Sequence, residues 1–225
     1  MKKSILAVFL MLCQVNFGQD KITKDLGDFS KVKVFDRISL HLVPGNENKL
    51  EISGDRKNNV EVVNNNGELK VRMKLGKLLK GDDINATLYF TDKIESLEAS
   101  EGSYLSSEAA FKAIDFDVDA KEGAEIKISL NVQKLNARAS SGGILRLSGT
   151  ASSQDGVINS GAALKAKDLN TKLTAITVNA GGEAEVRASD LVDAKTRAGG
   201  SIHIYGNPKQ VNKKNVIGGT INIHK

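Results

Sequence analysis

The chain has 225 residues, a net charge of +5, aromatic residues at 4% of its length, no tryptophan and one cysteine. Its charges are spread evenly, and no basic segment is interleaved with aromatic residues, which argues against a nucleic-acid partner. Because the one cysteine, Cys13, lies close to the N-terminus, we expect neither disulfides nor thiolate chemistry in the rest of the chain.

Residues 1–18 have the pattern of a signal peptide. Two lysines near the start precede a short apolar run at residues 5–12, and Gly18 is suited to cleavage after it. The run is shorter than the ~20 residues that cross a bilayer, and no later segment is longer. We therefore expect an exported protein without a transmembrane segment, located in the periplasm, on the outer-membrane surface or outside the cell. Lipid attachment to Cys13 is a less favoured alternative, because Leu12 stands where a small residue is usual.

Residues 19–28 form a short lead, and residues 29–99 contain seven short apolar clusters that predict strands. Turn motifs such as Pro44-Gly45-Asn46 and the run at 64–67 separate these clusters. We expect the strands to form irregular first coils or a hairpin-rich cap over the end of the fold. For residues 74–83 the sequence leaves two alternatives, a short helix or a loop.

Residues 100–225 repeat at an interval of about nineteen residues. Seven glycines mark the repeat at successive intervals of 21, 19, 19, 20, 18 and 19 residues. They are Gly102, Gly123, Gly142, Gly161, Gly181, Gly199 and Gly218. We interpret them as corners, where glycine allows positive φ or close backbone approach.

Apolar and polar residues alternate after each corner, which predicts a strand with one buried and one exposed face. The second and fourth places are mostly apolar, as at Ile126 and Ile128. The third place, between them, is occupied in successive coils by Lys127, Arg146, Lys165, Glu185, His203 and Asn222. Such a strand buries its apolar face only by stacking on the next coil. The sequence therefore predicts an all-β fold, a single-domain parallel β-helix-like solenoid over residues 29–225.

The chain resembles a known family on three features. A β-rich lead begins Phe29-Ser-Lys-Val-Lys-Val, serial Ser-Gly or Gly-Gly corners follow, and residues 205–208 read Tyr-Gly-Asn-Pro. In these features it resembles the "putative autotransporter adhesin head GIN domain" family, a domain of unknown function common in exported proteins of Bacteroidetes. The resemblance covers roughly residues 29–207. It implies a β-helix-like fold and an adhesive role, and it supplies no catalytic residues.

The third-place residues of three successive coils predict a basic column made of Lys127, Arg146 and Lys165. Lys167 and Arg187 flank it. Like charges on adjacent strands repel each other unless an anion or an acidic glycan lies against them. These five residues are therefore our candidates for a ligand-binding face. Ordinary solvent-facing charges on a solenoid are the simpler alternative.

Other chemistry-bearing residues give weaker patterns. His203 and His224 are expected to be neighbours on adjacent coils, but two exposed histidines without a carboxylate do not predict a metal site. Asp115, Asp117 and Asp119 alternate on one strand and are interpreted as its solvent-facing side. We predict no catalytic, metal-binding or cofactor-binding residues and no cofactor.

The sequence favours a non-enzymatic surface or envelope binding module, with a glycan or an envelope component as the expected partner. A carbohydrate-active β-helix lyase or hydrolase is the first alternative, and it requires carboxylates that converge in a cleft. A periplasmic signalling-associated or structural module is the second. A groove lined by acidic residues from three neighbouring coils would favour the enzyme.

Overall fold

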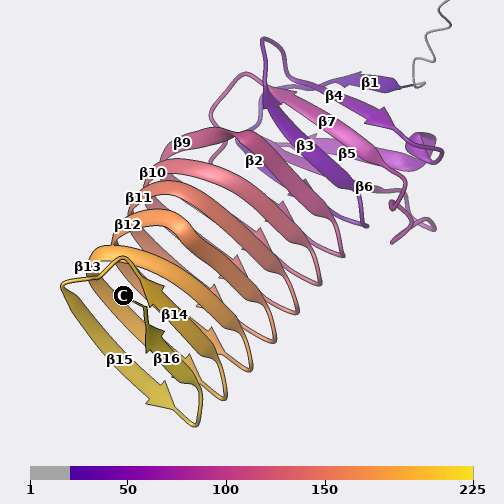
Figure 1. Cartoon of the computed structure of the whole chain (residues 1–225). Coiled ribbons are helices and arrows are strands. Elements are labelled where there is room, and N and C mark those ends of the chain that lie inside the picture. The colour runs from indigo at the N-terminus through magenta and orange to yellow at the C-terminus, as the bar shows by residue number, and fades with distance from the viewer. Residues whose placement is uncertain (1–20, 225) are drawn as a thin grey trace, which may run out of the picture.

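A computed structural model describes residues 21–224, so the predicted signal peptide at 1–18 and Cys13 lie outside the described residues. The strands β9 to β16 stack as successive coils of a solenoid, with the N-terminal strands at one end (Figure 1). The helical content of the described part is a single 3₁₀ turn, η1, at Lys57–Asn59. These observations confirm the predicted all-β parallel solenoid.

Each regular coil is one long curved strand followed by a tight corner. The five strands are β9 (Tyr104–Ala120), β10 (Glu125–Ala139), β11 (Ile144–Ile158), β12 (Ala163–Asn179) and β13 (Glu183–Arg197). In β10 the fifteen strand residues and the four corner residues 140–143 together give the nineteen-residue repeat. Alternate side chains of β10 are buried, and the two consecutive exposed residues Gln133 and Lys134 mark the outer bend. Parallel pairing places equivalent residues of successive coils side by side, so the core is continuous.

The corners are tight turns with two consecutive residues at positive φ, the combination of a type I′ turn. At one corner φ is 50° at Ser141 and 75° at Gly142. The amide of Gly143 donates to the carbonyl of Ser140 at 2.9 Å, which closes the turn. A Cβ added at Gly142 would touch no atom within 4 Å, so glycine is needed there for its backbone conformation. At Gly143 the reason is space, because a Cβ would lie 2.1 Å from the carbonyl oxygen of Ala120.

The N-terminal part holds both coils and an antiparallel cover. β2 (Lys31–Val34) pairs in parallel with β6 (Glu68–Met73) and β8 (Ser96–Ala99). β3 (Ser39–Pro44) pairs in parallel with β7 (Asn85–Phe90) and β9. The coil formed by β2 and β3, the first in the sequence, therefore lies between the coil formed by β6 and β7 and the coil formed by β8 and β9.

Three antiparallel strands cover the outer side of the coil formed by β6 and β7. β4 (Lys49–Ser53) lies against β7, β5 (Val60–Asn65) lies against β6, and β1 (Ile22–Asp25) lies against β4. Residues 74–83 form turns rather than a helix. The buried carboxylate of Asp36 holds this connection by accepting the amides of Met73 at 2.9 Å and Leu79 at 2.8 Å.

The last coil ends the core with polar side chains. It consists of β14 (Ser201–Tyr205) stacked on β13, followed by β15 (Gln210–Val216) and β16 (Thr220–Ile223). Lys213 and Asn215 occupy the inward columns that Ala194 and Thr196 hold one coil earlier. Their side chains donate to the carbonyls of Ile221 at 3.3 Å and Gly219 at 2.6 Å. Inward polar groups of this kind protect an open sheet end from further stacking.

Candidate binding groove

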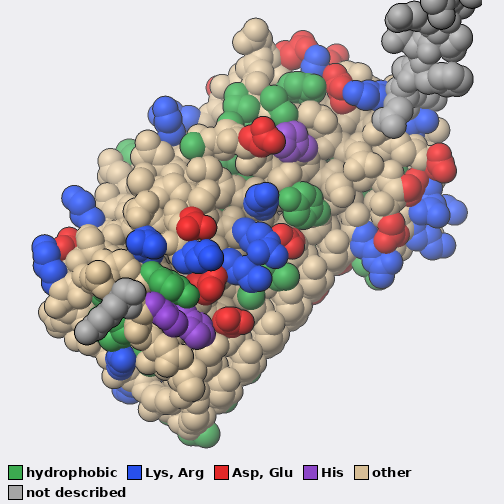
Figure 2. Space-filling model, in the orientation of Figure 1, with side chains coloured by type: hydrophobic (Ala, Val, Ile, Leu, Met, Phe, Trp, Pro, Cys, Tyr) green, Lys and Arg blue, Asp and Glu red, His purple; other side chains and the backbone are tan. Residues whose placement is uncertain are grey.

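The basic column exists as a row of laterally paired residues on the outer face. Lys127 pairs with Arg146, and Arg146 pairs with Lys165, each on the neighbouring strand. The row continues to Glu185 and His203 in one direction and to Ser106 and His41 in the other. The face seen in Figure 2 carries a cluster of Lys and Arg side chains over these middle coils.

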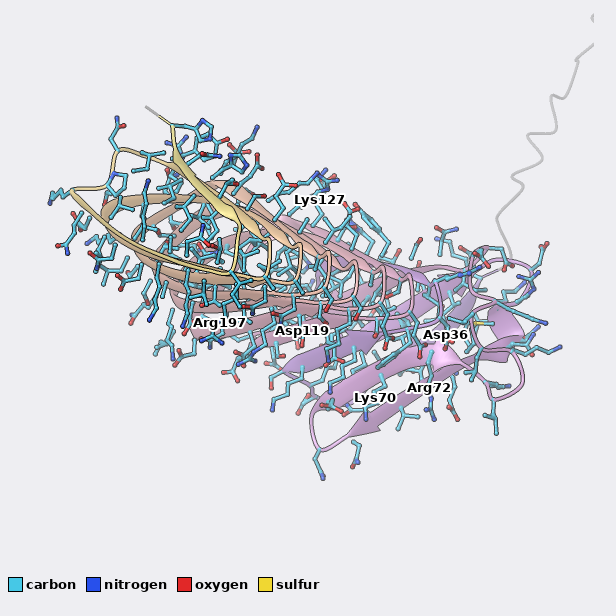
Figure 3. The ribbon with its side chains drawn as sticks, turned by 90° about the horizontal axis from the view of Figure 1, so that it is seen from below. Asp36, Lys70, Arg72, Asp119, Lys127 and Arg197 are labelled. Atoms are coloured by element: carbon cyan, nitrogen blue, oxygen red, sulfur yellow. The ribbon has the colours of Figure 1, made fainter. Side chains whose placement is uncertain are left out.

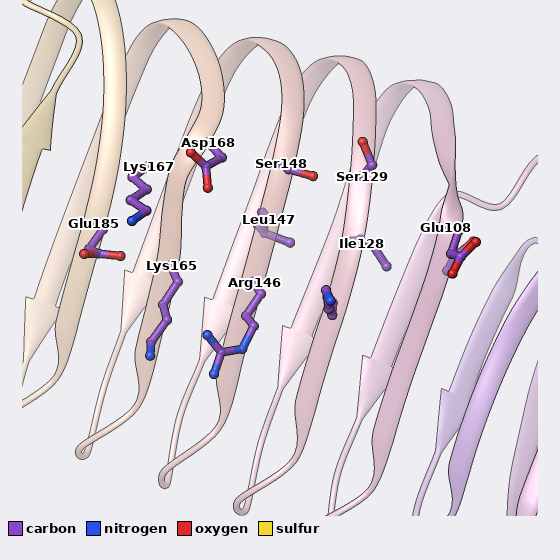
Figure 4. Close-up of a pocket in the computed structure, with 12 residues that line it drawn as sticks. Glu108, Ile128, Ser129, Arg146, Leu147, Ser148, Lys165, Lys167, Asp168 and Glu185 are labelled. Atoms are coloured by element: carbon purple, nitrogen blue, oxygen red, sulfur yellow. The ribbon is translucent and has the colours of Figure 1, made fainter.

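An open groove of about 710 Å³ lies along the column. Lys127, Arg146, Lys165 and Lys167 line it, and the almost fully buried side chains of Ile128 and Leu147 lie beneath it (Figure 4). Four of the five residues predicted from the sequence thus lie in one groove.

Arg187 lies elsewhere. Its Nε donates to the carbonyl of Lys167 at 2.7 Å, and its side chain lines a smaller hollow of about 410 Å³ nearer the outer bend.

Irregular pairing on both sides of the groove gives it its shape. Between the pairs Ser106–Lys127 and Ala110–Ser129, β9 has two more residues than β10. Between the pairs Arg146–Lys165 and Ser148–Asp168, β12 has one more residue than β11. Such bulges bend a strand and redirect its side chains, and they often lie beside functional sites.

The positive charges of the groove are only partly neutralised. The guanidinium of Arg146 is held by the carboxylate of Glu125 from the preceding coil. Lys127, Lys165 and Lys167 form no ion pair within residues 21–224 and are exposed. Three ammonium groups are therefore available to an anionic ligand.

Acidic residues lie at the two ends of the groove and were not predicted to take part. Glu108 lies at the end formed by β9, while Asp168 and Glu185 lie at the end formed by β12 and β13 (Figure 4). β10 and β11, between them, contribute Lys127 and Arg146. The groove thus has acidic residues from three coils, but the three coils are not consecutive.

The histidines and the alternating aspartates lie outside the groove. His203 Nδ1 and His224 Nε2 are 2.9 Å apart, and Tyr205 stacks on His224 with ring centroids 4.6 Å apart. The part of the chain that the structure describes contains no cluster of three or more residues suited to a metal ion. Asp117, on the other limb of the coil, accepts a hydrogen bond from Asn136 at 2.9 Å. No helix within residues 21–224 is long and apolar enough to cross a membrane.

The fold and the groove define a glycine-cornered parallel β-solenoid with a charged groove on its outer face. The chain belongs to the family described as "Putative auto-transporter adhesin, head GIN domain", which it matches over residues 28–208. This match confirms the resemblance that the lead and the corner motifs carry.

Solved structures of bacterial proteins share the fold. A "putative adhesin" from Bacteroides fragilis superposes with a TM-score of 0.82 at 19% identity, covering 92% of this chain and 98% of that one. A "putative adhesin" from Parabacteroides distasonis gives a TM-score of 0.72 at 16% identity, with 91% and 96% covered. A "putative lipid binding protein" from the same species gives 0.67 at 15% identity, with 92% and 98% covered. No curated protein matches the chain.

Proposed function

We propose that this chain is an exported, non-enzymatic binding module of the adhesin-head type, which holds an acidic glycan or another anionic envelope component in the groove. The observation that carries the proposal is the row of Lys127, Arg146 and Lys165 on adjacent strands, with Lys167 beside it, in which the three lysines have no ion-pair partners among the described residues. Cations on adjacent strands ~4.8 Å apart repel one another, and a polyanion along the solenoid axis would relieve that repulsion. Family membership supports an adhesive role.

The test is a binding screen of the purified protein against acidic and neutral glycans and envelope components. The triple variant Lys127→Ala, Arg146→Ala and Lys165→Ala should lose up to roughly a hundredfold in affinity for any acidic ligand found, since each exposed charge contact contributes at most about 1 kcal/mol. A variant with the same loss of charge at the exposed outer-bend residues Lys112, Lys134 and Lys172 serves as control. Equal binding by the wild type and the groove variant would refute the proposal.

A second candidate function is cleavage of the bound glycan. Asp168 and Glu185 from neighbouring strands lie at the same end of the groove as Lys165 and Lys167, an arrangement that a carbohydrate lyase or hydrolase could use. Incubation with each ligand from the screen, followed by measurement of new reducing ends or unsaturated products, separates the two functions. Cleavage that is lost in Asp168→Asn or Glu185→Gln, with binding retained, would establish the enzyme.

A further inference from the structure

A second cationic surface lies on the other limb of the coils, at the C-terminal end. Lys195 pairs laterally with Lys214, and Arg197 follows Lys195 by two residues, so it projects from the same face of β13. Within residues 21–224 none of the three forms an ion pair. The pKa of the Lys195 ammonium is lowered, mostly by the positive charge of Arg197 and further by partial desolvation and by Lys214. The three cations are thus close enough to repel one another.

The N-terminal coils of the same limb show how such charges are neutralised elsewhere. Lys33 lies between Glu68 at 3.0 Å and Glu98 at 3.3 Å. Lys121 contacts Glu98 at 3.1 Å and Asp119 at 3.3 Å. Positive charge is therefore balanced at one end of this face and unbalanced at the other.

An exposed apolar corner adjoins the three cations. Val216 pairs laterally with Arg197, and the next residue, Ile217, is 85% exposed. Ile217 has φ of 56°, a strained conformation for a β-branched residue. The earlier corners place Glu, Ser or Ala at this position. Ile217 is strained and yet buries almost nothing within the chain, so packing inside the fold does not account for a β-branched residue at this position.

We propose that Lys195, Arg197, Lys214, Val216 and Ile217 form a C-terminal patch that docks on an anionic lipid surface. The three cations would face phosphate groups of lipid headgroups, and Ile217 would enter the boundary between headgroups and acyl chains. A second copy of the chain is a poorer occupant, because a symmetric contact would oppose like charges. A free anion would leave Ile217 without a role. The patch is separate from the groove, since Arg197 and Lys127 lie on opposite sides of the solenoid (Figure 3).

The test is co-sedimentation of the purified protein with phosphatidylcholine vesicles that contain or lack phosphatidylglycerol. We expect binding only to the anionic vesicles, weakened by added salt. Replacing Lys195, Arg197 and Lys214 by Gln should lower the partition coefficient roughly a hundredfold, as each cation near the surface contributes about a fivefold gain. Ile217→Asn, which tolerates positive φ, should lower it roughly threefold to tenfold.

Two matched controls make the result decisive. Gln at Lys127, Arg146 and Lys165 removes the same charge from the groove and should leave vesicle binding intact. Leu75→Asn removes an apolar side chain that is 91% exposed near the other end of the fold and should also have no effect. If wild-type protein ignores anionic vesicles, or if the groove variant loses as much binding as the patch variant, the patch is not the docking surface. Vesicle binding that is unchanged in Ile217→Asn would overturn the assignment to lipid. Because the patch variant retains the groove, glycan binding reports on the proposed function separately.

Discussion

Two adjacent glycines at one corner should respond differently to substitution by alanine. At Gly142 an added Cβ has open space around it, so Gly142→Ala incurs only the cost of a left-handed backbone at a residue with a side chain, about 1 to 2 kcal/mol. At Gly143 the added Cβ would lie 2.1 Å from the carbonyl oxygen of Ala120. That carbonyl accepts the amide of Ser140 at 3.0 Å, so relieving the overlap disturbs the hydrogen bonding between two coils. We expect Gly143→Ala to cost about 3 kcal/mol or more.

Urea unfolding followed by circular dichroism measures both variants. The midpoint should fall moderately for Gly142→Ala and strongly for Gly143→Ala, with an unchanged denaturant dependence. Ala162 occupies the place of Gly143 in the next coil, so Ala162→Gly is a matched control expected to cost about 1 kcal/mol. If the two variants lost the same amount of unfolding free energy, it would be wrong that Gly142 is needed for its backbone conformation and Gly143 for lack of space.

Three further changes test the core and the ends of the solenoid. Gln154 is buried, and its side-chain amide has no hydrogen-bond partner among the described residues. Leu135 holds the equivalent place in the preceding coil, so Gln154→Leu should stabilise the fold by about 1 to 3 kcal/mol and raise the melting temperature. A lower melting temperature would contradict this. The pKa of Glu101 is raised, first by desolvation and then by Asp36, so its charged form is disfavoured in the folded state. Glu101→Gln should therefore have a larger free energy of unfolding than wild type at pH 7, and the difference should vanish as the pH falls below the ordinary glutamate pKa. Urea unfolding at several pH values measures this, and a difference that does not depend on pH would contradict it. The double variant Lys213→Val and Asn215→Val removes the polar cover of the last coil. Sedimentation velocity should then show self-association of the protein, and a variant that stays monomeric would argue against the capping role.

The regular coils could be predicted from the sequence because in-register stacking gives every coil the same environment. Alternation such as Ile126-Lys127-Ile128 repeats at a fixed distance from each corner glycine, and the structure buries both isoleucines. The N-terminal part could not be predicted to the same depth. Its apolar clusters identify strands, but β2 pairs with β6 and β8, which are far away in the sequence. Such pairings depend on tertiary packing, which no local pattern encodes.

The basic column could be predicted for the same reason as the core, since equal spacing from the corners places Lys127, Arg146 and Lys165 side by side. Periodicity could not show that Glu125 would neutralise Arg146, or that Arg187 would turn toward the carbonyl of Lys167. Those contacts depend on rotamers and on the local path of the backbone. The acidic ends of the groove also went unpredicted, because Glu108 lies within one irregular step in the pairing of the strands and Asp168 directly follows another.

The uneven glycine intervals nevertheless contain a sign of the groove. The interval of 21 residues from Gly102 contains the two extra residues of β9, and the interval of 20 residues from Gly161 contains the extra residue of β12. The two coils between them keep 19 residues and supply Lys127 and Arg146. A coil cannot add residues on its inner face without disturbing the packed core, so added residues bulge outward. Small differences in coil length can therefore shape the binding surface while the buried columns stay in register.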